Sequence, residues 1–77
     1  MENFSIHAYR KKELAILYFP NNDPHTAVKN FMRLIRRCDM LWDALLASGY
    51  QPYNKTFTPR QVALVVEWIG APELGAS

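Results

Sequence analysis

Most of what the sequence predicts comes from one stretch, Pro24-His25-Thr26-Ala27-Val28-Lys29-Asn30-Phe31-Met32-Arg33-Leu34-Ile35-Arg36-Arg37. Its basic residues recur at i, i+4, i+7 and i+8, so a helix gathers on one side Lys29, Arg33, Arg36 and Arg37. Apolar residues at i, i+4, i+7 and i+11 form a separate side of Ala27, Phe31, Leu34 and Cys38. One face for a core and one for phosphates is typical of a DNA-reading helix, although an ordinary solvated surface helix has the same pattern.

Local signals set the bounds of this helix and of a shorter one before it. Residues 11–18 are expected to form the first helix, which ends because Pro20 restricts the residue that precedes it. Asp23 is a typical N-cap, and Pro24 suits the first helical position because its missing N–H has no partner there. The second helix is therefore expected over residues 24–37.

Two further helices follow. Asp39 is expected to cap a third helix over residues 40–48, which Gly49 closes as a residue with positive φ. The clearest start signal in the chain is Thr58-Pro59-Arg60-Gln61, a capping box that opens a fourth helix over residues 59–69.

Residues 4–9 alternate between apolar and polar side chains, which favours a short strand. The predicted fold class is mainly α: a compact, helix-turn-helix-like domain of four helices, with room for one two-stranded β-ribbon joining residues 4–8 to 54–57. With 77 residues the chain forms a single domain, 1–77, with an ordered core over about 4–72 and a frayed C-terminal tail.

The composition favours a cytoplasmic protein without a membrane partner. Apolar residues make up 49% of the chain, which is enough for one small core. A single cysteine, Cys38, argues for a reducing compartment. No basic segment with an apolar run follows Met1, and no stretch approaches the roughly 20 apolar residues that span a bilayer.

Charge is distributed unevenly along the chain. Residues 10–37 carry seven Lys or Arg against two acidic residues, whereas residues 38–77 carry two against four. This asymmetry favours an anionic partner for the first half of the chain.

The sequence offers little for catalysis. The soft metal ligands are His7, His25 and Cys38, with no recognisable metal spacing, and Cys38 at the end of an apolar stripe is expected to be an inert core thiol. No glycine-rich phosphate loop or nucleophile–base pair is present, and so small a chain leaves little room for a pocket of several hundred Å3. We expect no enzyme activity, no cofactor, no metal and no small-molecule substrate.

The aromatic residues are numerous for a chain of this size. Tyr18, Phe31, Phe57 and Trp68 are expected in the core. Tyr50 and Tyr53 flank Pro52, where they either pack their rings over the core or stack on a base or a partner.

The fourth helix is apolar almost all round, which predicts either a central core position or a surface shared with a second copy. The candidate homodimer interface consists of Val62, Val66, Trp68 and Ile69.

Several motifs together resemble a family of short proteins from gut anaerobic bacteria that is classed as a domain of unknown function. The resemblance covers residues 4–72 and is most specific in a Phe-Thr-Pro-x-Gln-Val block; its motifs are Tyr9-Arg10-Lys11-Lys12-Glu13-Leu14-Ala15, Tyr18-Phe19-Pro20, Ala27, Gly49-Tyr50, Phe57-Thr58-Pro59-Arg60-Gln61-Val62 and Gly70-Ala71-Pro72. It implies no activity and no catalytic residues. The first half also resembles a helix-turn-helix module, although residues 19–23 make a longer turn than that motif usually has.

Two functions follow as alternatives. The first is a DNA-binding or transcription-associated module that contacts double-stranded DNA through Arg10, Lys11, Lys12, His25, Lys29, Asn30, Arg33, Arg36 and Arg37. In this hypothesis His25 and Asn30 read base edges while the Lys and Arg residues contact phosphates. The second is a homodimeric protein-interaction module that binds no nucleic acid.

Overall fold

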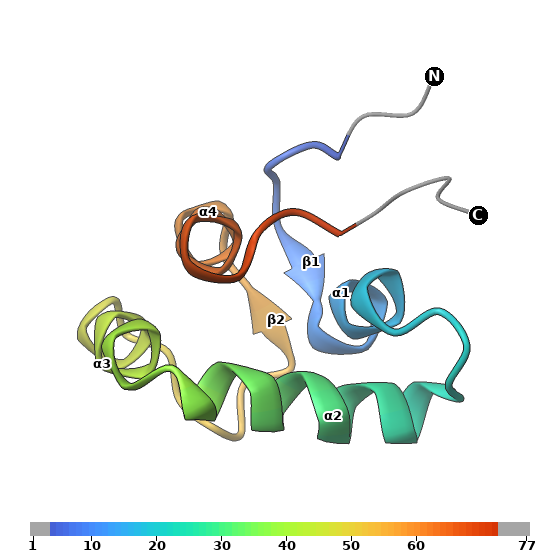
Figure 1. Cartoon of the computed structure of the whole chain (residues 1–77). Coiled ribbons are helices and arrows are strands. Elements are labelled where there is room, and N and C mark those ends of the chain that lie inside the picture. Colours follow the sequence, from blue (N-terminus) through green and yellow to red (C-terminus); the bar gives the residue numbers. More distant parts are fainter. Residues whose placement is uncertain (1–3, 73–77) are drawn as a thin grey trace.

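A computed structural model describes residues 4–72 of the chain, which form four helices and one two-stranded antiparallel ribbon (Figure 1). The elements in chain order are β1 (Tyr9–Arg10), α1 (Lys11–Tyr18), α2 (Pro24–Arg37), α3 (Asp39–Ala47), β2 (Thr56–Phe57) and α4 (Pro59–Ile69). The mainly helical fold class with a short ribbon is confirmed. Within this part of the chain no helix has the length and apolar character needed to cross a bilayer.

The expected bounds of α1 and α2 are also confirmed. The Asp23 carboxylate accepts a hydrogen bond from the Thr26 N–H at 3.3 Å, and the bonds from Thr26 hold the pKa of this carboxyl below its usual value. Both Ala15 of α1 and Ala27 of α2 are completely buried. Two small side chains let the helices approach closely, and α1 packs more extensively on α2 than on any other element.

The buried face of α2 differs from the expected one in its last members. Ala27, Phe31 and Ile35 are completely buried, whereas Leu34 and Cys38 are half-buried. The buried residues of α2 are thus spaced by four residues throughout, whereas the expected spacing was four and then three. This face is buried because α2 runs beneath α1, the ribbon and the start of α3 (Figure 1). The basic residues of α2 remain exposed, as predicted.

Asp39 does not cap α3. The backbone carbonyl of Cys38 accepts the first helical bond, from the Trp42 N–H at 2.9 Å, so Cys38 is the N-cap and Asp39 is the first helical residue. A carboxylate there still interacts favourably with the helix dipole. At the other end the expected glycine is confirmed: Gly49 has a φ of 98°, which lets its N–H and that of Tyr50 return to the last carbonyls of α3.

The second strand of the ribbon lies within the expected residues 54–57, but the first strand forms later in the chain than expected. Tyr9 pairs with Phe57 and Arg10 with Thr56, so residues 4–8 are not part of the sheet. Phe57 is completely buried, and this fixes the pairing because a shift by one residue would turn its ring toward solvent.

The capping box that starts α4 is confirmed. The Thr58 hydroxyl accepts from the Gln61 N–H at 3.2 Å, and the Gln61 Oε1 accepts from the Thr58 N–H at 3.1 Å. Gln61 is nevertheless buried, because its amide also donates to the Ser48 hydroxyl at the end of α3. Two side chains of α4 depart from expectation: Trp68 is 41% exposed rather than in the core, and Val62 is completely buried in its own chain, which removes it from any dimer surface.

A row of aromatic rings crosses the core from α1 to α3. The centroids of neighbouring rings lie 5.0 to 6.1 Å apart in the order Tyr18, Phe31, Phe57, Tyr50 and Trp42. The two loop tyrosines therefore separate: the Tyr50 ring is in the core, while the Tyr53 ring is 78% exposed. Burial raises the pKa of both Tyr18 and Tyr50 to about 12.

Candidate nucleic-acid interface

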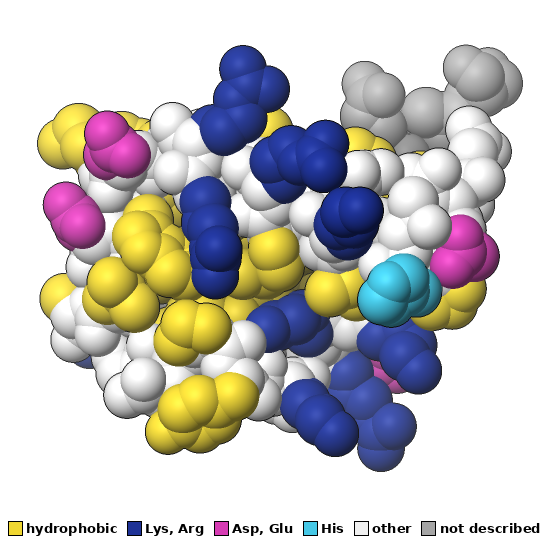
Figure 2. Space-filling model, turned by 90° about the horizontal axis from the view of Figure 1, so that it is seen from below, with side chains coloured by type: hydrophobic (Ala, Val, Ile, Leu, Met, Phe, Trp, Pro, Cys, Tyr) yellow, Lys and Arg dark blue, Asp and Glu magenta, His cyan; other side chains and the backbone are white. Residues whose placement is uncertain are grey.

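The exposed side of α2 forms half of one strongly basic face of the molecule. Figure 2 shows many Lys and Arg side chains on this face, in two groups with hydrophobic side chains between them. The first group lines a shallow hollow of about 490 Å3, named here the helix groove, which consists of Lys29, Met32, Arg33, Arg36 and Arg37.

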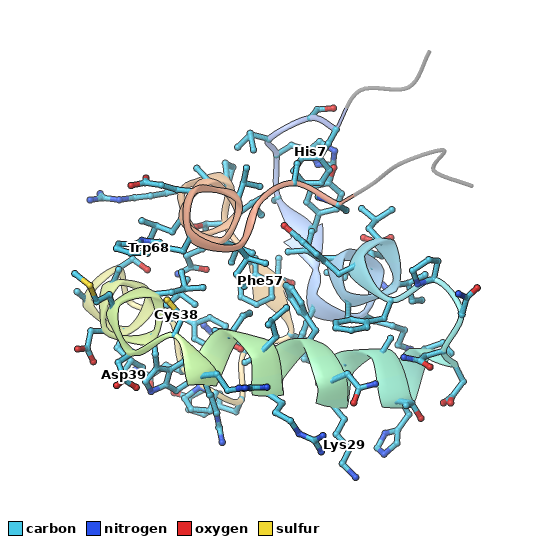
Figure 3. The ribbon with its side chains drawn as sticks, viewed as in Figure 1. His7, Lys29, Cys38, Asp39, Phe57 and Trp68 are labelled. Carbon is cyan, nitrogen blue, oxygen red and sulfur yellow. The ribbon has the colours of Figure 1, made fainter. Side chains whose placement is uncertain are left out.

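The fold turns these cations away from the core. In Figure 3 Lys29 points down and away from α2, while Phe57 lies between the helices on the other side. This follows from the spacing of α2: Lys29 and Arg33 lie about 160–200° around the helix from the buried Phe31. The four cations of the helix groove are thus available to solvent or to an anionic partner.

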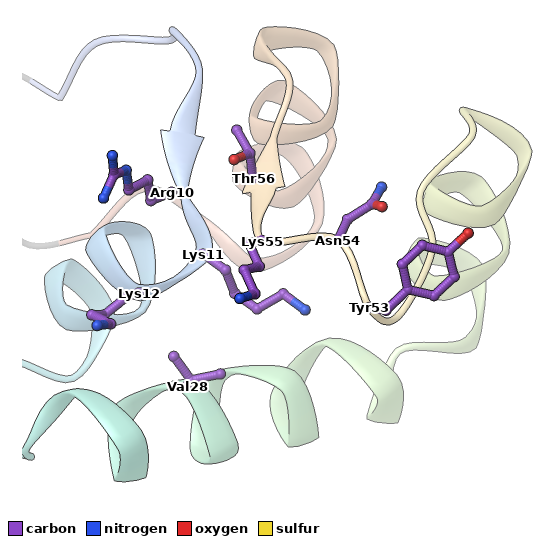
Figure 4. Close-up of a pocket in the computed structure, with 8 residues that line it drawn as sticks. All are labelled: Arg10, Lys11, Lys12, Val28, Tyr53, Asn54, Lys55 and Thr56. Carbon is purple, nitrogen blue, oxygen red and sulfur yellow. The ribbon is translucent and has the colours of Figure 1, made fainter.

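The second group lines a larger hollow beside α2, named here the strand groove. Its volume is about 500 Å3, and its lining residues are Arg10, Lys11, Lys12, Val28, Tyr53, Asn54, Lys55 and Thr56 (Figure 4). The chain was expected to leave little room for a pocket of several hundred Å3, but it forms an open groove of this size between α2 and the ribbon with its preceding loop.

Backbone pairing brings together cations that are distant in sequence. The Lys11 N–H donates to the Lys55 carbonyl at 2.8 Å, which continues the ribbon by one bond and places the two lysines side by side. The Glu13 carboxylate accepts from the Arg10 N–H at 3.2 Å and so closes the start of α1, where Arg10, Lys11 and Lys12 follow one another in the chain. A two-residue ribbon thus assembles half of the basic face.

Two cations are held at the boundary between the grooves by the aromatic core. The Lys11 ammonium donates to the Pro52 carbonyl at 2.9 Å and lies 5.2 Å from the centre of the Tyr50 ring. The Arg36 guanidinium lies 5.1 Å from the centre of the Trp42 ring. Such contacts restrict both side chains and keep their charges on the surface.

Positive charge is crowded at this boundary. Partial burial, together with the nearby Arg36 guanidinium, lowers the pKa of Lys11 below its ordinary value. Of the described residues, no Asp or Glu lines either groove. An anion bound between the two grooves would therefore relieve repulsion as well as gain attraction.

Eight of the nine Lys and Arg residues of the chain line the two grooves, four in each, and Arg60 is the exception. The structure thus brings together all seven Lys and Arg residues expected to contact DNA. Neither groove is lined by the two residues expected to read bases, His25 and Asn30. His25 is exposed near the start of α2, whereas Asn30 is half-buried and lies about 160° around α2 from Val28, which lines the strand groove.

Lys55 was not among the site residues expected from the sequence. For Tyr53 the sequence left open whether the ring packs on the core or stacks on a base or a partner. Both belong to the strand groove. A signal for Lys55 was present, because residues 54–57 were expected to pair with the N-terminal strand, and this pairing carries Lys55 to the basic start of α1.

Two further observations concern metal ligands and the cysteine thiol. Within residues 4–72, no three side chains of His, Cys, Asp or Glu come close enough together to hold a metal ion. The Cys38 thiol, expected in the core, is half-buried at the junction of α2 and α3 and packs against the core.

Comparisons with known proteins complete the description of the site. No curated protein and no solved structure matches the chain. A family does match, over residues 5–72, which is nearly all of the sequence. The chain thus belongs to the family described as a domain of unknown function, DUF4248.

Proposed function

We propose that this protein is a small nucleic-acid-binding module that holds double-stranded DNA on its basic face. The observation that carries the proposal is the segregation of charge: eight of nine cations line two adjoining grooves that contain no acidic residue of the described chain. A surface of this kind supplies phosphate contacts, which account for nearly all non-specific DNA affinity.

In this proposal α2 is the helix that approaches the duplex, in a helix-turn-helix-like arrangement with α1 packed behind it. The 14 residues of α2 span about 21 Å, and its four cations follow the exposed side from Lys29 to the last residue, Arg37. The cations of the strand groove contact the flanking backbone. His25 is the remaining candidate for a base contact, since Asn30 is half-buried.

The test is a salt series of binding to a random-sequence duplex, followed by fluorescence anisotropy. The double variant Arg33→Gln/Arg37→Gln should bind more weakly and flatten the slope of log K against log[salt] by roughly 2, because each lost phosphate contact contributes about 0.9. Gln has a helix propensity comparable with that of Arg, so α2 should remain intact.

Arg60→Gln provides a control, because it makes the same Arg-to-Gln change at one cation that lies outside both grooves. It should change the slope little. Absence of binding by the unmodified protein at about 50 mM salt and about 100 μM protein would refute DNA binding, since non-specific sites typically bind with 10⁻⁴–10⁻⁶ M at higher salt.

A second candidate function, a homodimeric interaction module, is favoured by a different observation. Met40 of α3 and Trp68 of α4 are 65% and 41% exposed, and these two helices pack against each other on the side away from α1. The remaining candidate interface residues, Val66 and Ile69, are half-buried. Sedimentation of the wild type as a monomer at high micromolar concentration would contradict this candidate; a dimer that Trp68→Glu converts to a folded monomer would support it.

We further propose that the protein acts by binding rather than by catalysis, and that it does so in a bacterial cytoplasm, where chromosomal DNA is directly accessible.

A further inference from the structure

We infer that the strand groove binds single-stranded nucleic acid, with phosphates on its four cations and one unpaired base stacked on Tyr53. This inference rests on the proposed function in one respect, because both take phosphates on the basic face. It adds a different ligand, an unpaired strand, and a different site, the groove between the ribbon and α2.

The Tyr53 ring lies in solvent at the edge of the strand groove. Its side chain is 78% exposed, more than any other large apolar or aromatic side chain of the described chain. The preceding aromatic residue, Tyr50, stacks on Phe57 at 5.0 Å, so the core takes one loop tyrosine and leaves the other in solvent. An exposed aromatic ring within a basic groove is the arrangement that stacks on bases in single-strand binding proteins.

The loop that presents Tyr53 is fastened at both ends. The Asn54 N–H donates to the Gln51 carbonyl at 2.9 Å and closes a turn that contains Tyr53. The Lys11 ammonium donates to the Pro52 carbonyl, and the Lys55 carbonyl accepts from the Lys11 N–H. Less conformational freedom is therefore lost when a base stacks on Tyr53 than in an unanchored loop.

The cations of the groove are arranged as a strand requires. In Figure 4 the Tyr53 ring stands at one end, Arg10 and Lys12 lie at the other, and Lys11 and Lys55 lie between them. A strand with its base on Tyr53 can therefore continue its phosphates along the groove. The volume of about 500 Å3 falls within the range of about 300–1,000 Å3 in which proteins usually hold small ligands such as a nucleotide unit.

A duplex does not use these features equally well. In a duplex each base is stacked between its neighbours, so its flat face is closed to a protein ring, whereas a single strand can turn a base out. The shallow helix groove of α2 suits phosphates of a duplex, and the strand groove with its exposed ring suits an unpaired strand.

The test compares two chains with the same number of phosphates: oligothymidylate of about ten nucleotides and an abasic chain of the same length. Binding is measured by fluorescence anisotropy at low salt. The wild type should bind oligothymidylate about tenfold more tightly than the abasic chain, because stacking is lost in the latter. Tyr53→Ala should abolish this preference and leave the affinity for the abasic chain unchanged, whereas Tyr53→Phe should retain the preference.

Met40→Ala is the matched control, because it removes another exposed apolar side chain that lines neither groove. It should leave both affinities unchanged. Since Tyr53 is so exposed, its variants should keep the thermal transition of the wild type, so that a loss of binding reports on the groove.

The outcomes separate this inference from the proposed function. Equal wild-type affinity for oligothymidylate and the abasic chain, or a preference that survives in Tyr53→Ala, overturns the stacking site while duplex binding stands. Binding to neither a duplex nor a single strand overturns both. Lys12→Gln/Lys55→Gln should weaken single-strand binding more than Arg33→Gln/Arg37→Gln does; the reverse order would assign the single strand to α2 and contradict the inference.

Discussion

Helices α2 and α4 each bury three side chains completely or nearly so, yet they use their outer faces in opposite ways. In α2 the buried residues are Ala27, Phe31 and Ile35, and a cationic face lies opposite them. In α4 they are Gln61, Val62 and Val65, and the outer surface includes Trp68. The amide of Gln61 is in the core because each of its polar atoms has a partner. A helix with clearly separated polar and apolar residues therefore has a predictable buried face. In an almost uniformly apolar helix, the packing of neighbouring elements determines which face is buried.

The largest expected effect tests whether the core depends on α2. Phe31 contacts the rings of both Tyr18 and Phe57, at 5.0 and 6.0 Å between centroids. Phe31→Ala should destabilise the fold by about 3–5 kcal/mol and unfold so small a domain. Trp68→Ala on α4 removes an even larger ring but should cost about 1 kcal/mol, because that ring is already partly in water. Equal shifts in the denaturant midpoints of the two variants would contradict this ranking.

The stability of the fold at alkaline pH tests whether two buried tyrosines connect α2 and α4 to the same core. Tyr18 donates to the Gly70 carbonyl after α4, and Tyr50 donates to the Met32 sulfur of α2. Burial raises the pKa of both tyrosines from 10.0 to about 12. Their neutral forms therefore stabilise the fold fully below pH 10, and this contribution is lost as the pH rises toward 12.

The lowered pKa of Lys11 has the opposite effect on stability, because the loss of its charge at high pH favours the folded state. This effect comes from one lysine, whereas two tyrosines contribute the opposing effect. Tyrosinate absorbance and circular dichroism should change together in this pH range. Ionisation of all tyrosines near pH 10, with the helices intact, would show that the two rings are not buried in solution.

A smaller effect concerns the amide that α4 buries. Thr58→Ala should destabilise the fold by about 1 kcal/mol, because the hydroxyl that accepts from the Gln61 N–H is lost. Gln61→Ala should cost about 1–3 kcal/mol, since it removes both the bond to Thr58 and the one to Ser48. Ser48→Ala removes the latter bond, together with the bond from the Ser48 hydroxyl to the Leu45 carbonyl, but keeps the capping box, and its cost should fall below that of Gln61→Ala. A denaturant midpoint unchanged in both Thr58→Ala and Gln61→Ala would mean that the capping box does not form.

The smallest expected effect concerns the outer face of α2. Arg33→Gln/Arg37→Gln should change the free energy of unfolding by no more than about 0.5 kcal/mol, because exposed residues without buried partners contribute little to stability. This variant should lose DNA affinity while keeping its midpoint. A large loss of stability would instead assign these arginines a structural role and weaken the contrast between the two helices.

The four helices could be predicted from local signals, because these act within a few residues. Asp23 with Pro24, Gly49, and Thr58 with Gln61 each mark a helix end in the structure. The ribbon was expected but placed too early, since alternation in residues 4–8 does not reveal which residue meets Phe57. Asp39 was misassigned because the start of α3 depends on the Cys38 carbonyl rather than on a side chain.

The candidate site could be predicted in part for the same reason. The cations of α2 and the start of α1 are visible as local clusters in the sequence. Lys55 and Tyr53 join them through pairing between segments more than 40 residues apart, such as the bond from Lys11 to the Pro52 carbonyl.

The helical segments and the cationic face of α2 follow from the sequence alone, because capping and periodicity are local properties of the chain. Long-range packing sets the rest: Tyr50 enters the core while Tyr53 remains in solvent, Gln61 is buried, and two groups of four cations adjoin. The physical reason is that burial and proximity depend on the neighbours that packing supplies. Those neighbours come from distant parts of the chain.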